Sequence, residues 1–457
     1  MKTTFRHLLC FLKWVALLLL VLIAAVIAMN AFDEPLRPEA SAMLDAKPDV
    51  PDEQNAFYAF IALSLEDSDL YASGHRRLER LRLVDAQRLS YEDGMRALEE
   101  PRHAAFATLD LLSNPAGLEQ NRALVRSKPA DARQLLDSRR EALERYRRLK
   151  NYPRFADLSP QDPSSPSIND WMAVHTARKL WGLQLATQIE AGEIDLAIAD
   201  LKSDTLYWRK ILAEPDTRLT GKMFIVSLVR SDLSMAGALL RTTPLSPAQM
   251  APLRGIASPI SDAERSLAGA FKDELRFGRH FLERLPPFDA GAMLRRPSAE
   301  TPPSLFDKAK ARIEDHFFLF NATINEMYRQ NQDLIAWDRL TCIEQTWHDF
   351  HVDEPRAWEL AYNYTGKIIS AVGVEAYGRY SGRMCDLVGF QRMLALQLRI
   401  AVEQVPDAGI AGFVTNAGPN DADPNSGEPM RWLTELHALS FDARDAVNRR
   451  DWLPWRI

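Results

Sequence analysis

The chain has 457 residues, 46% of them hydrophobic and 26% charged, with a formal net charge of −6. This length is enough for one large domain or several ordinary ones, each with a buried core. Acidic and basic residues are interspersed, and no basic stripe with interleaved aromatic residues is present, so the composition argues against a nucleic-acid-binding protein.

Residues 14–32 form an uncharged apolar segment, WVALLLLVLIAAVIAMNAF. A helix rises 1.5 Å per residue, so about 20 apolar residues span the hydrocarbon core of a bilayer. The cations Lys2, Arg6 and Lys13 precede the segment, and positive charge on that side predicts a cytoplasmic N-terminus. We therefore expect a signal-anchor helix that binds the bilayer through residues 14–32 of a single-pass inner (plasma) membrane protein, with the rest of the chain periplasmic or otherwise extracytoplasmic.

The same segment has a second interpretation as a cleaved signal peptide. Val26, Ile27 and Ala28 offer a small-residue cleavage site. The apolar run is longer than the roughly 7–15 residues of a signal-peptide core, which favours a retained anchor. No later stretch approaches about 18 uncharged apolar residues, so we expect one span.

Changes in amino-acid composition along the chain predict five segments. Prolines between residues 33 and 54 exclude a continuous helix and indicate a tether. Helical periodicity after the tether predicts an all-α body, arranged as an antiparallel or solenoid-like bundle of many helices. The predicted segments are a cytoplasmic tail (1–13), the transmembrane helix (14–32), the Pro-rich tether (33–54), the helical extracytoplasmic domain (55–403), and a C-terminal loop and hairpin segment (404–457).

Apolar spacing predicts the helices of the body one by one. The expected ranges are 71–83, 130–150, 169–190, 194–213, 223–240, 267–282, 305–334, 340–350, 355–363 and 382–402. Gly192 is expected to turn the chain between two of them in an αα-hairpin. The helix over 223–240 is apolar on nearly all sides and should be buried. Ser261 and Glu264 have the spacing of a capping box before 267–282.

The C-terminal segment has a different character. Residues 423–429 (DPNSGEP) are turn-forming, and residues 430–433 and 438–441 are expected to pair as a small β-hairpin. The run DPNSGEPMRW (423–432) resembles a terminal segment of uncharacterised bacterial single-pass, inner-membrane-anchored helical proteins. FNATINEMY (320–328) and YTGKII (364–369) resemble further pieces of such proteins. The resemblance covers the last third of the chain, implies a bacterial inner-membrane origin and carries no known activity.

The chain has three cysteines, Cys10, Cys342 and Cys385. The last two lie in the part expected to cross the membrane, where oxidising conditions allow a disulfide. Two cysteines in a long chain are also commonly unpaired small apolar residues. Both interpretations stay open from the sequence.

His348 and His351 are the first pair of candidate metal ligands. They are three residues apart and would share one face of a helix, beside Asp349 and Asp353. The HExxH spacing is absent. A helix end before Pro355, where histidines interact with terminal carbonyl groups, is the favoured interpretation, so we expect neither a metal nor a cofactor.

Two other polar clusters have ordinary explanations beside functional ones. Asp421, Asp423 and Asn425 suggest a calcium loop, but Gly427 is one place late for the EF-hand pattern, and an Asx turn is favoured. The arginines of 76–82 could approach anionic lipid. Nearby glutamates favour a solvated surface instead.

The motifs of common hydrolases and nucleotide-binding proteins are missing, including G-x-S-x-G, the P-loop and G-x-G-x-x-G. We therefore predict a membrane-anchored cell-envelope protein with no assigned catalytic residues. Its helical body is expected to act as a non-enzymatic scaffold or to bind a protein partner on the periplasmic face. The alternative is a helical periplasmic enzyme, for instance a metal-dependent hydrolase, whose site would involve His348 and His351.

Overall fold

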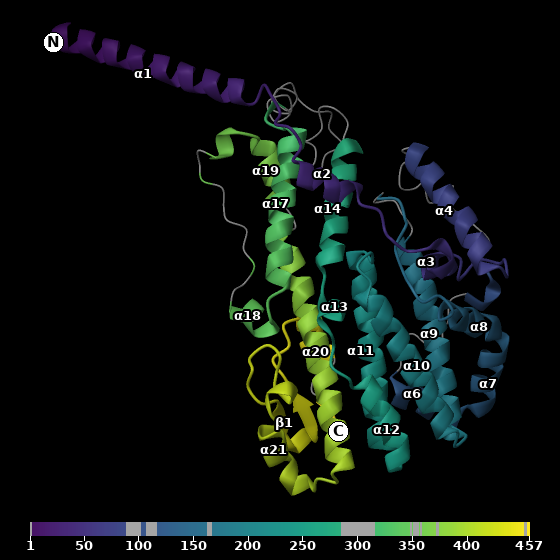
Figure 1. The fold of residues 1–457 in the computed structure, drawn as a ribbon. Helices are drawn as coiled ribbons and strands as arrows, with labels where there is room; N and C mark the ends of the chain where they lie inside the picture. Colours follow the sequence, from purple (N-terminus) through teal and green to yellow (C-terminus); the bar gives the residue numbers. More distant parts are fainter. Residues whose placement is uncertain are drawn as a thin grey trace. The chain divides into compact units, whose positions relative to one another are not determined.

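The computed structural model describes residues 2–87, 102–106, 117–161, 167–284, 316–347, 350, 356, 359–371, 374–451 and 455–457. The described chain is mostly helical, with an apolar N-terminal helix and a small C-terminal sheet (Figure 1). It divides into two compact units. Unit 1 comprises Met1–Ala46, Leu275–Leu334 and His351–Ala376, and unit 2 comprises Lys47–Glu274, Ile335–Phe350 and Tyr377–Ile457.

The α-helices have the following bounds: α1 (Lys2–Met29), α2 (Pro38–Asp45), α3 (Ala56–Ile61), α4 (Leu70–Gln87), α6 (Leu118–Ser127), α7 (Pro129–Ser138), α8 (Arg140–Leu149), α9 (Ser167–Glu190), α10 (Ile194–Ala213), α11 (Leu219–Thr242), α12 (Pro247–Ile256), α13 (Asp262–Arg265), α14 (Ala268–Arg284), α17 (Phe320–Asp338), α18 (Cys342–Trp347), α19 (Tyr364–Ala371), α20 (Val374–Val402), α21 (Asp407–Thr415) and α22 (Ala446–Asp451). The strands are β1 (Arg431–Leu433), β2 (Ala438–Ser440) and β3 (Trp455–Arg456).

Two helices have the length and apolar composition to cross a membrane. Cys10–Met29 of α1 has a mean hydropathy of 2.8 and is not buried in the protein, which suits an anchor or a signal sequence. Helix α11 has a mean hydropathy of 1.5, but 61% of it is buried, as expected for a core helix. Helix α1 ends at Met29, before the predicted limit at residue 32, because the Asn30 side chain donates back to the carbonyl group of Val26 (2.8 Å).

Unit 1 has a small apolar core that includes part of the predicted tether. Leu44 of α2 packs with Leu275 and Leu282 of α14 and with Ile324 of α17. The guanidinium group of Arg276 also donates to the carbonyl groups that end α2. The prolines do limit this segment to a short helix. The segment nevertheless packs into unit 1 as far as residue 46, instead of forming a free tether.

In the described part of the helix predicted over 305–334, residues 317–319 are not helical and α17 begins at Phe320. The chain turns away from helical geometry at Phe317–Leu319, because backbone groups there bond to another segment. The N–H of Leu319 donates to Asn363 Oδ1 (2.8 Å), and the carbonyl group of Phe317 accepts from the N–H of Thr365 (3.1 Å). Of the helix predicted over 355–363, the described residues contain a 3₁₀ turn at Glu359–Ala361.

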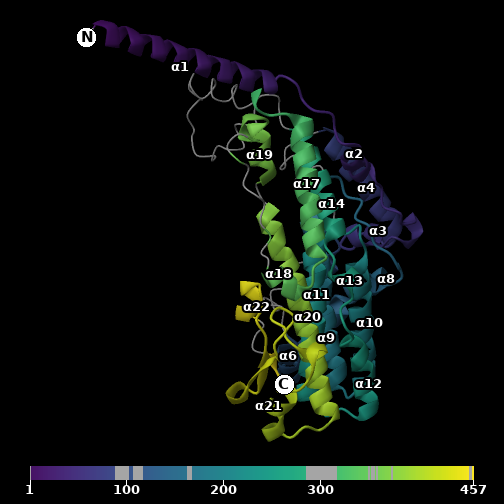
Figure 2. The same cartoon turned by 60° about the vertical axis from the view of Figure 1, so that its left-hand side comes forward.

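Unit 2 contains the predicted αα-hairpin. Helices α9 and α10 are joined at Gly192, whose φ of +83° favours glycine. Helix α10 packs against α9, α11 and α12, and these helices lie side by side in Figures 1 and 2. The aromatic side chains of Trp171, Tyr146 and Trp208 are buried between them.

Two predicted helices of unit 2 are divided. The helix over 130–150 is broken at Arg139 into α7 and α8. At the break, the Ser138 hydroxyl group donates a hydrogen bond to the carbonyl group of Leu135 (2.9 Å). The Ser261–Glu264 capping box is present. However, it begins only the four-residue helix α13, and α14 starts separately at Ala268.

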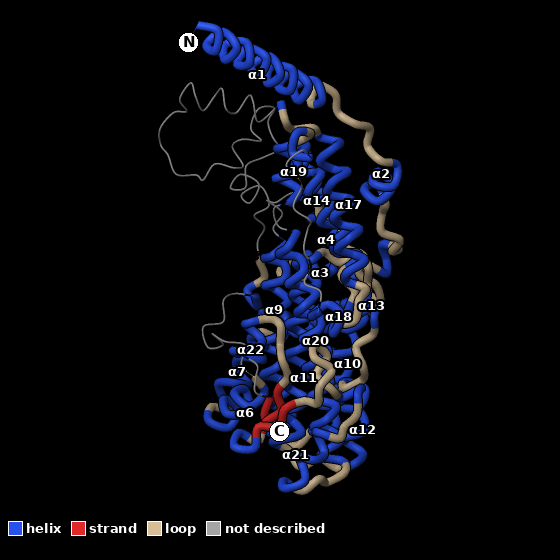
Figure 3. Tube along the Cα trace, turned by 90° about the vertical axis from the view of Figure 1, so that its left-hand side faces the viewer, coloured by secondary structure: helices blue, strands red, loops and turns tan. Residues whose placement is uncertain are grey.

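The predicted C-terminal hairpin is present and has a third strand. Strands β1 and β2 are antiparallel, with Trp432 opposite Leu439. Strand β3 adds to the other edge of β2 with Trp455 opposite Leu439, and all three lie together in Figure 3. Sequence analysis predicted no strand at Trp455–Arg456.

Candidate functional site

The residues that follow α1 are bound into unit 1 by a dense set of hydrogen bonds. They contact two segments that are far away in the sequence, the start of α17 and the chain before α19. We call this arrangement the membrane-proximal joint, and define it as residues 30–37 together with residues 319–325 and 361–366. It is the best-defined candidate functional site among the described residues, because it connects the apolar helix to folded protein.

Asn30 lies at the centre of the joint. Its side-chain nitrogen donates to the carbonyl groups of Val26 (2.8 Å) and Ala361 (2.7 Å), and its side-chain oxygen accepts from the N–H of Asn363 (2.8 Å). Both donors of the amide group and its oxygen are therefore engaged, at a residue that is 3% exposed. One side chain thus binds the last turn of α1 to residues 361–363.

Asp33 caps the N-terminus of α17 from a distant part of the chain. Its carboxylate oxygens accept from the N–H groups of Asn321 (2.7 Å) and Ala322 (3.0 Å). These amide groups lie in the first helical turn and have no acceptor within the helix. The negative charge also interacts favourably with the helix dipole. A cap that usually comes from the adjacent residue is here supplied by the segment leaving α1.

Asn325, one turn farther along α17, binds the next residues of the same segment. Its side-chain nitrogen donates to Glu34 Oε1 (2.6 Å) and to the carbonyl group of Pro35 (3.1 Å). Its side-chain oxygen accepts from the N–H of Arg37 (2.9 Å). Residues 33–37 therefore run along α17 and are bonded to it at successive turns.

Asn363 completes the joint from the other side. Its φ of +52° is in the left-handed region, and its side chain bonds to the N–H of Leu319 (2.8 Å) and to Thr323 Oγ1 (3.1 Å). A Cβ atom at Gly366 would lie 2.0 Å from Thr323 Oγ1 and 2.3 Å from Asn363 Oδ1. The close approach of the two segments therefore requires glycine at position 366.

An apolar groove adjoins the joint and has a volume of about 630 Å³. One wall is α1 and the other is the short segment before α17. His316 Nε2 lies 3.3 Å from the carbonyl oxygen of Ile27, where the two walls meet. The lining residues are Leu19, Leu22, Ile23, Val26, Ile27, His316 and Phe317.

A second polar cluster, in the core of unit 2, comprises Tyr146, Arg178, Asp204 and Asp232. Arg178 forms ion pairs with both aspartates, and the Tyr146 hydroxyl group lies 3.0 Å from each carboxylate oxygen of Asp204. All four side chains are buried. Burial raises the pKa of Asp232 to about 7, against the opposing effect of Arg178. The cluster links α8, α9, α10 and α11, and its enclosure indicates a structural role.

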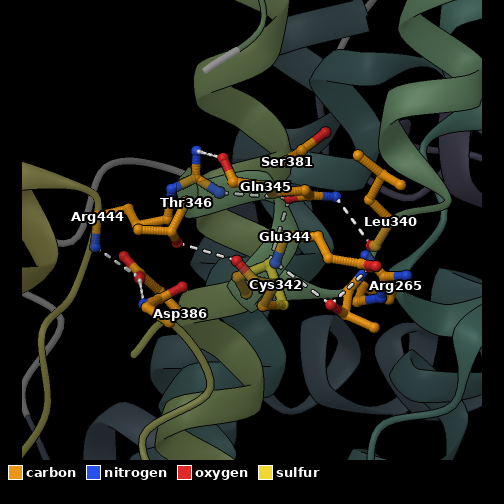
Figure 4. Close-up of a disulfide and its surroundings, with 12 residues drawn as sticks. Arg265, Leu340, Cys342, Glu344, Gln345, Thr346, Ser381, Asp386 and Arg444 are labelled. Atoms are coloured by element: carbon orange, nitrogen blue, oxygen red, sulfur yellow. Dashed lines mark hydrogen bonds between the residues drawn. A yellow bond between two sulfur atoms is a disulfide. The ribbon is translucent and has the colours of Figure 1, made fainter. Parts of the chain in front are cut away.

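The cysteines of unit 2 form a disulfide between Cys342 and Cys385. It joins α18 to α20 beside a buried polar group that holds the chain before α22 (Figure 4). There, Asp386 Oδ1 accepts from the N–H of Arg444 (2.8 Å), and the Arg444 guanidinium group donates to Gln345 Oε1 (3.3 Å). Of the two interpretations that the sequence left open for these cysteines, the structure contains the disulfide.

The candidate metal ligands His348 and His351 lie outside the described residues. Within the described ranges, no group of three His, Cys, Asp or Glu side chains could hold a metal ion. The calcium-loop candidate forms an Asx turn, in which Asp423 Oδ1 accepts from the N–H of Asn425 (2.8 Å). The other oxygen of Asp423 accepts from the N–H of Asp442 (2.7 Å), so both are engaged within the protein.

The arginine-rich surface of α4 is paired with acidic side chains. Arg76 contacts Asp67, and Arg82 lies 2.7 Å from Glu79 on the exposed side. Arg77 instead points inward to Asp170. These contacts agree with the solvated-surface interpretation.

Comparison of the chain with protein-family models, curated proteins and solved structures found no match. The resemblance of residues 320–328, 364–369 and 423–432 to anchored bacterial proteins stays a prediction. Two of these motifs nevertheless contribute residues to the joint, namely Asn321, Asn325 and Gly366. The predicted transmembrane helix (14–32) includes Asn30 and the predicted tether (33–54) includes Asp33 and Glu34, and no partner is predicted from the sequence for any of the three.

Proposed function

We propose that this protein is anchored in the inner membrane by α1 and acts as a non-enzymatic binding protein. In this proposal its helical body lies on the periplasmic side and binds another envelope protein. The membrane-proximal joint is the observation that carries the proposal. Three side chains immediately after α1 (Asn30, Asp33 and Glu34) bond to distant residues of unit 1, so the end of α1 is held against folded protein. The bond from Asn30 to the carbonyl group of Val26 exists only while α1 is retained.

Two further observations support the orientation. Positive residues precede the apolar segment, which favours a cytoplasmic N-terminus. The Cys342–Cys385 disulfide belongs in an oxidising compartment, on the opposite side of the membrane from the cytoplasm. The free Cys10 lies at the N-terminal side of the span.

The burial and internal bonding of the polar clusters favour a binding function over a catalytic one. The ionisable groups around Arg178 and Asp386 are buried and are bonded mainly to one another or to backbone groups. Exposed apolar side chains on α9 and α10, by contrast, include Met172, Leu196 and Leu206. Side chains of this kind can contact a protein partner at a modest cost in polar desolvation.

The test is photo-crosslinking in intact cells, with a photoreactive amino acid at Met172, Leu196 or Leu206 of the full-length protein. We expect one envelope protein to be captured repeatedly from at least one position. The same positions in a version whose α1 is replaced by a cleaved signal peptide should capture much less of it, because the body is no longer held at the membrane. Recovery of the protein alone from all three positions would overturn the proposal.

A further inference from the structure

We propose that the groove beside the joint holds a fatty-acyl chain of a membrane lipid. The inference rests on the proposed retention of α1 as an anchor. The groove runs along a helix that is not buried in protein, and its residues Leu19 and Ile23 are 54% and 55% exposed. In a bilayer, the medium in contact with this helix is hydrocarbon.

The shape of the groove matches a chain-like apolar ligand. Counted from Leu19, its α1 residues occupy positions i, i+3, i+4, i+7 and i+8, and so lie on one face of the helix. From Leu19 to Ile27 the helix rises about 12 Å. Phe317 supplies the opposite wall from outside α1. A lipid chain lying along this face would contact both α1 and Phe317 of the segment before α17.

The residue types favour a lipid chain over a second membrane helix. Helices in membranes pack closely through small residues. The small residues of this part of α1, Ala24, Ala25 and Ala28, are absent from the groove, whose α1 residues are all leucine, isoleucine or valine. Bulky side chains keep a second helix backbone at a distance, whereas a flexible acyl chain can fill the space between them.

One end of the groove is suited to the polar end of a lipid. His316 lies where α1 ends, near the carbonyl group of Ile27, and this is the level at which a membrane helix meets the interface. The N–H group that His316 directs at this carbonyl group can instead donate to an ester or phosphate oxygen of a lipid. The groove therefore combines an apolar length with a hydrogen-bonding group at its interfacial end.

The experiment uses the full-length protein in vesicles of phosphatidylethanolamine and phosphatidylglycerol. The probe is a phosphatidylcholine with a diazirine on one acyl chain close to its ester group, so that the reactive carbon lies near His316 and Phe317. After irradiation and digestion, we expect labelling of Phe317 as well as α1. Val26→Trp should reduce labelling at Phe317 about tenfold, the effect of losing contact with about two methylene groups.

Val21→Trp is the matched control, because Val21 is a valine of the same helix that is exposed and absent from the groove lining. It should leave labelling at Phe317 unchanged. Leu19→Trp, at the other end of the groove, should act like Val26→Trp and guards against misfolding of one variant. Equal effects of the three variants, labelling of α1 without Phe317, or crosslinks between two copies through the groove would overturn the inference. An intact mass that lacks residues 1–28 would instead show that the anchor is cleaved, and would contradict the proposed function.

Discussion

The N–H of Asn363 donates to the side-chain oxygen of Asn30 over 2.8 Å, although the two residues are 333 positions apart in the chain. The Asn30 side chain also donates to the carbonyl group of Val26 in the last turn of α1 and to that of Ala361. The end of the apolar helix is therefore held by a long-range contact and not by the local chain alone. The first two predictions test this contact.

Asn30→Ala should destabilise unit 1 by about 2–3 kcal/mol, because buried backbone groups at positions 361 and 363 lose their partner. Urea unfolding of the full-length protein in detergent micelles measures the loss. Asn416→Ala is the matched control: Asn416 makes the same i−4 bond to a helix carbonyl group, that of Gly412, but on an exposed surface. The control should cost about 0.5 kcal/mol or less. Equal effects of the two substitutions would show that the long-range bonds of Asn30 contribute nothing.

Asp33→Ala should speed hydrogen exchange of the Asn321 and Ala322 amides. The lost cap is worth about 1 kcal/mol, which corresponds to about fivefold faster exchange if α17 frays locally. Asp33→Asn retains an acceptor but loses the charge, so it should have a smaller effect. Unchanged exchange in both variants would mean that α17 begins independently of the segment after α1.

Asp232 should make the stability of unit 2 depend on pH. Its pKa is raised from 3.8 to about 7 by burial, so between these values the folded state binds more protons than the unfolded state. Stability contributed by the protonated group is then present below about pH 4 and is lost as the pH rises to about 7. Compared with Asp232→Asn, the original protein should lose a few kcal/mol across this range. Unfolding curves at intervals from pH 4.5 to 8 measure the difference, and a difference that grows in the opposite direction would refute this assignment.

Removal of the disulfide should destabilise unit 2 substantially. Cys342 and Cys385 are separated by 43 positions, and closing a loop of this size contributes about 4 kcal/mol in the chain-entropy model. The double variant Cys342→Ala/Cys385→Ala should unfold at lower urea concentration, and reducing agent should destabilise only the original protein. Thiol alkylation of rapidly quenched cells should modify Cys10 and leave the other two cysteines protected. Free thiols at positions 342 and 385 in cells would contradict a periplasmic body.

Much of unit 2 follows from local patterns. Gly192 marks the turn between α9 and α10, since a left-handed backbone at a helix end favours glycine. Helix α11 is apolar on nearly all sides, which predicts its burial. The turn residues before Met430 predict the β1–β2 hairpin. These signals act within a few residues, so the sequence displays them directly. The break at Arg139 was missed because the apolar spacing continues through it.

The joint could not be predicted in the same way. The bonds that residues 30–37 make in it join positions about 290 to 330 apart, and hydrogen bonds between single polar side chains and backbone groups leave no periodicity. An asparagine directly after an apolar run, and asparagines one helical turn apart at positions 321 and 325, were the available cues. They identify polar residues that need partners without indicating which partners. The prolines after α1 indicated a tether, yet they are compatible with a segment that runs along α17.

The separation of the joint's parts has a consequence for biogenesis. In the proposed function α1 enters the membrane during synthesis, when the residues of α17 that bind Asp33 and Glu34 are still about 290 positions from being made. At about 5–20 residues per second, roughly 15–60 s pass before the start of α17 leaves the ribosome. Insertion of the helix and orientation of unit 1 are therefore separate events, and the first part of unit 2 can fold between them. A nascent chain stopped before residue 320 would be inserted in the membrane but not yet aligned with it.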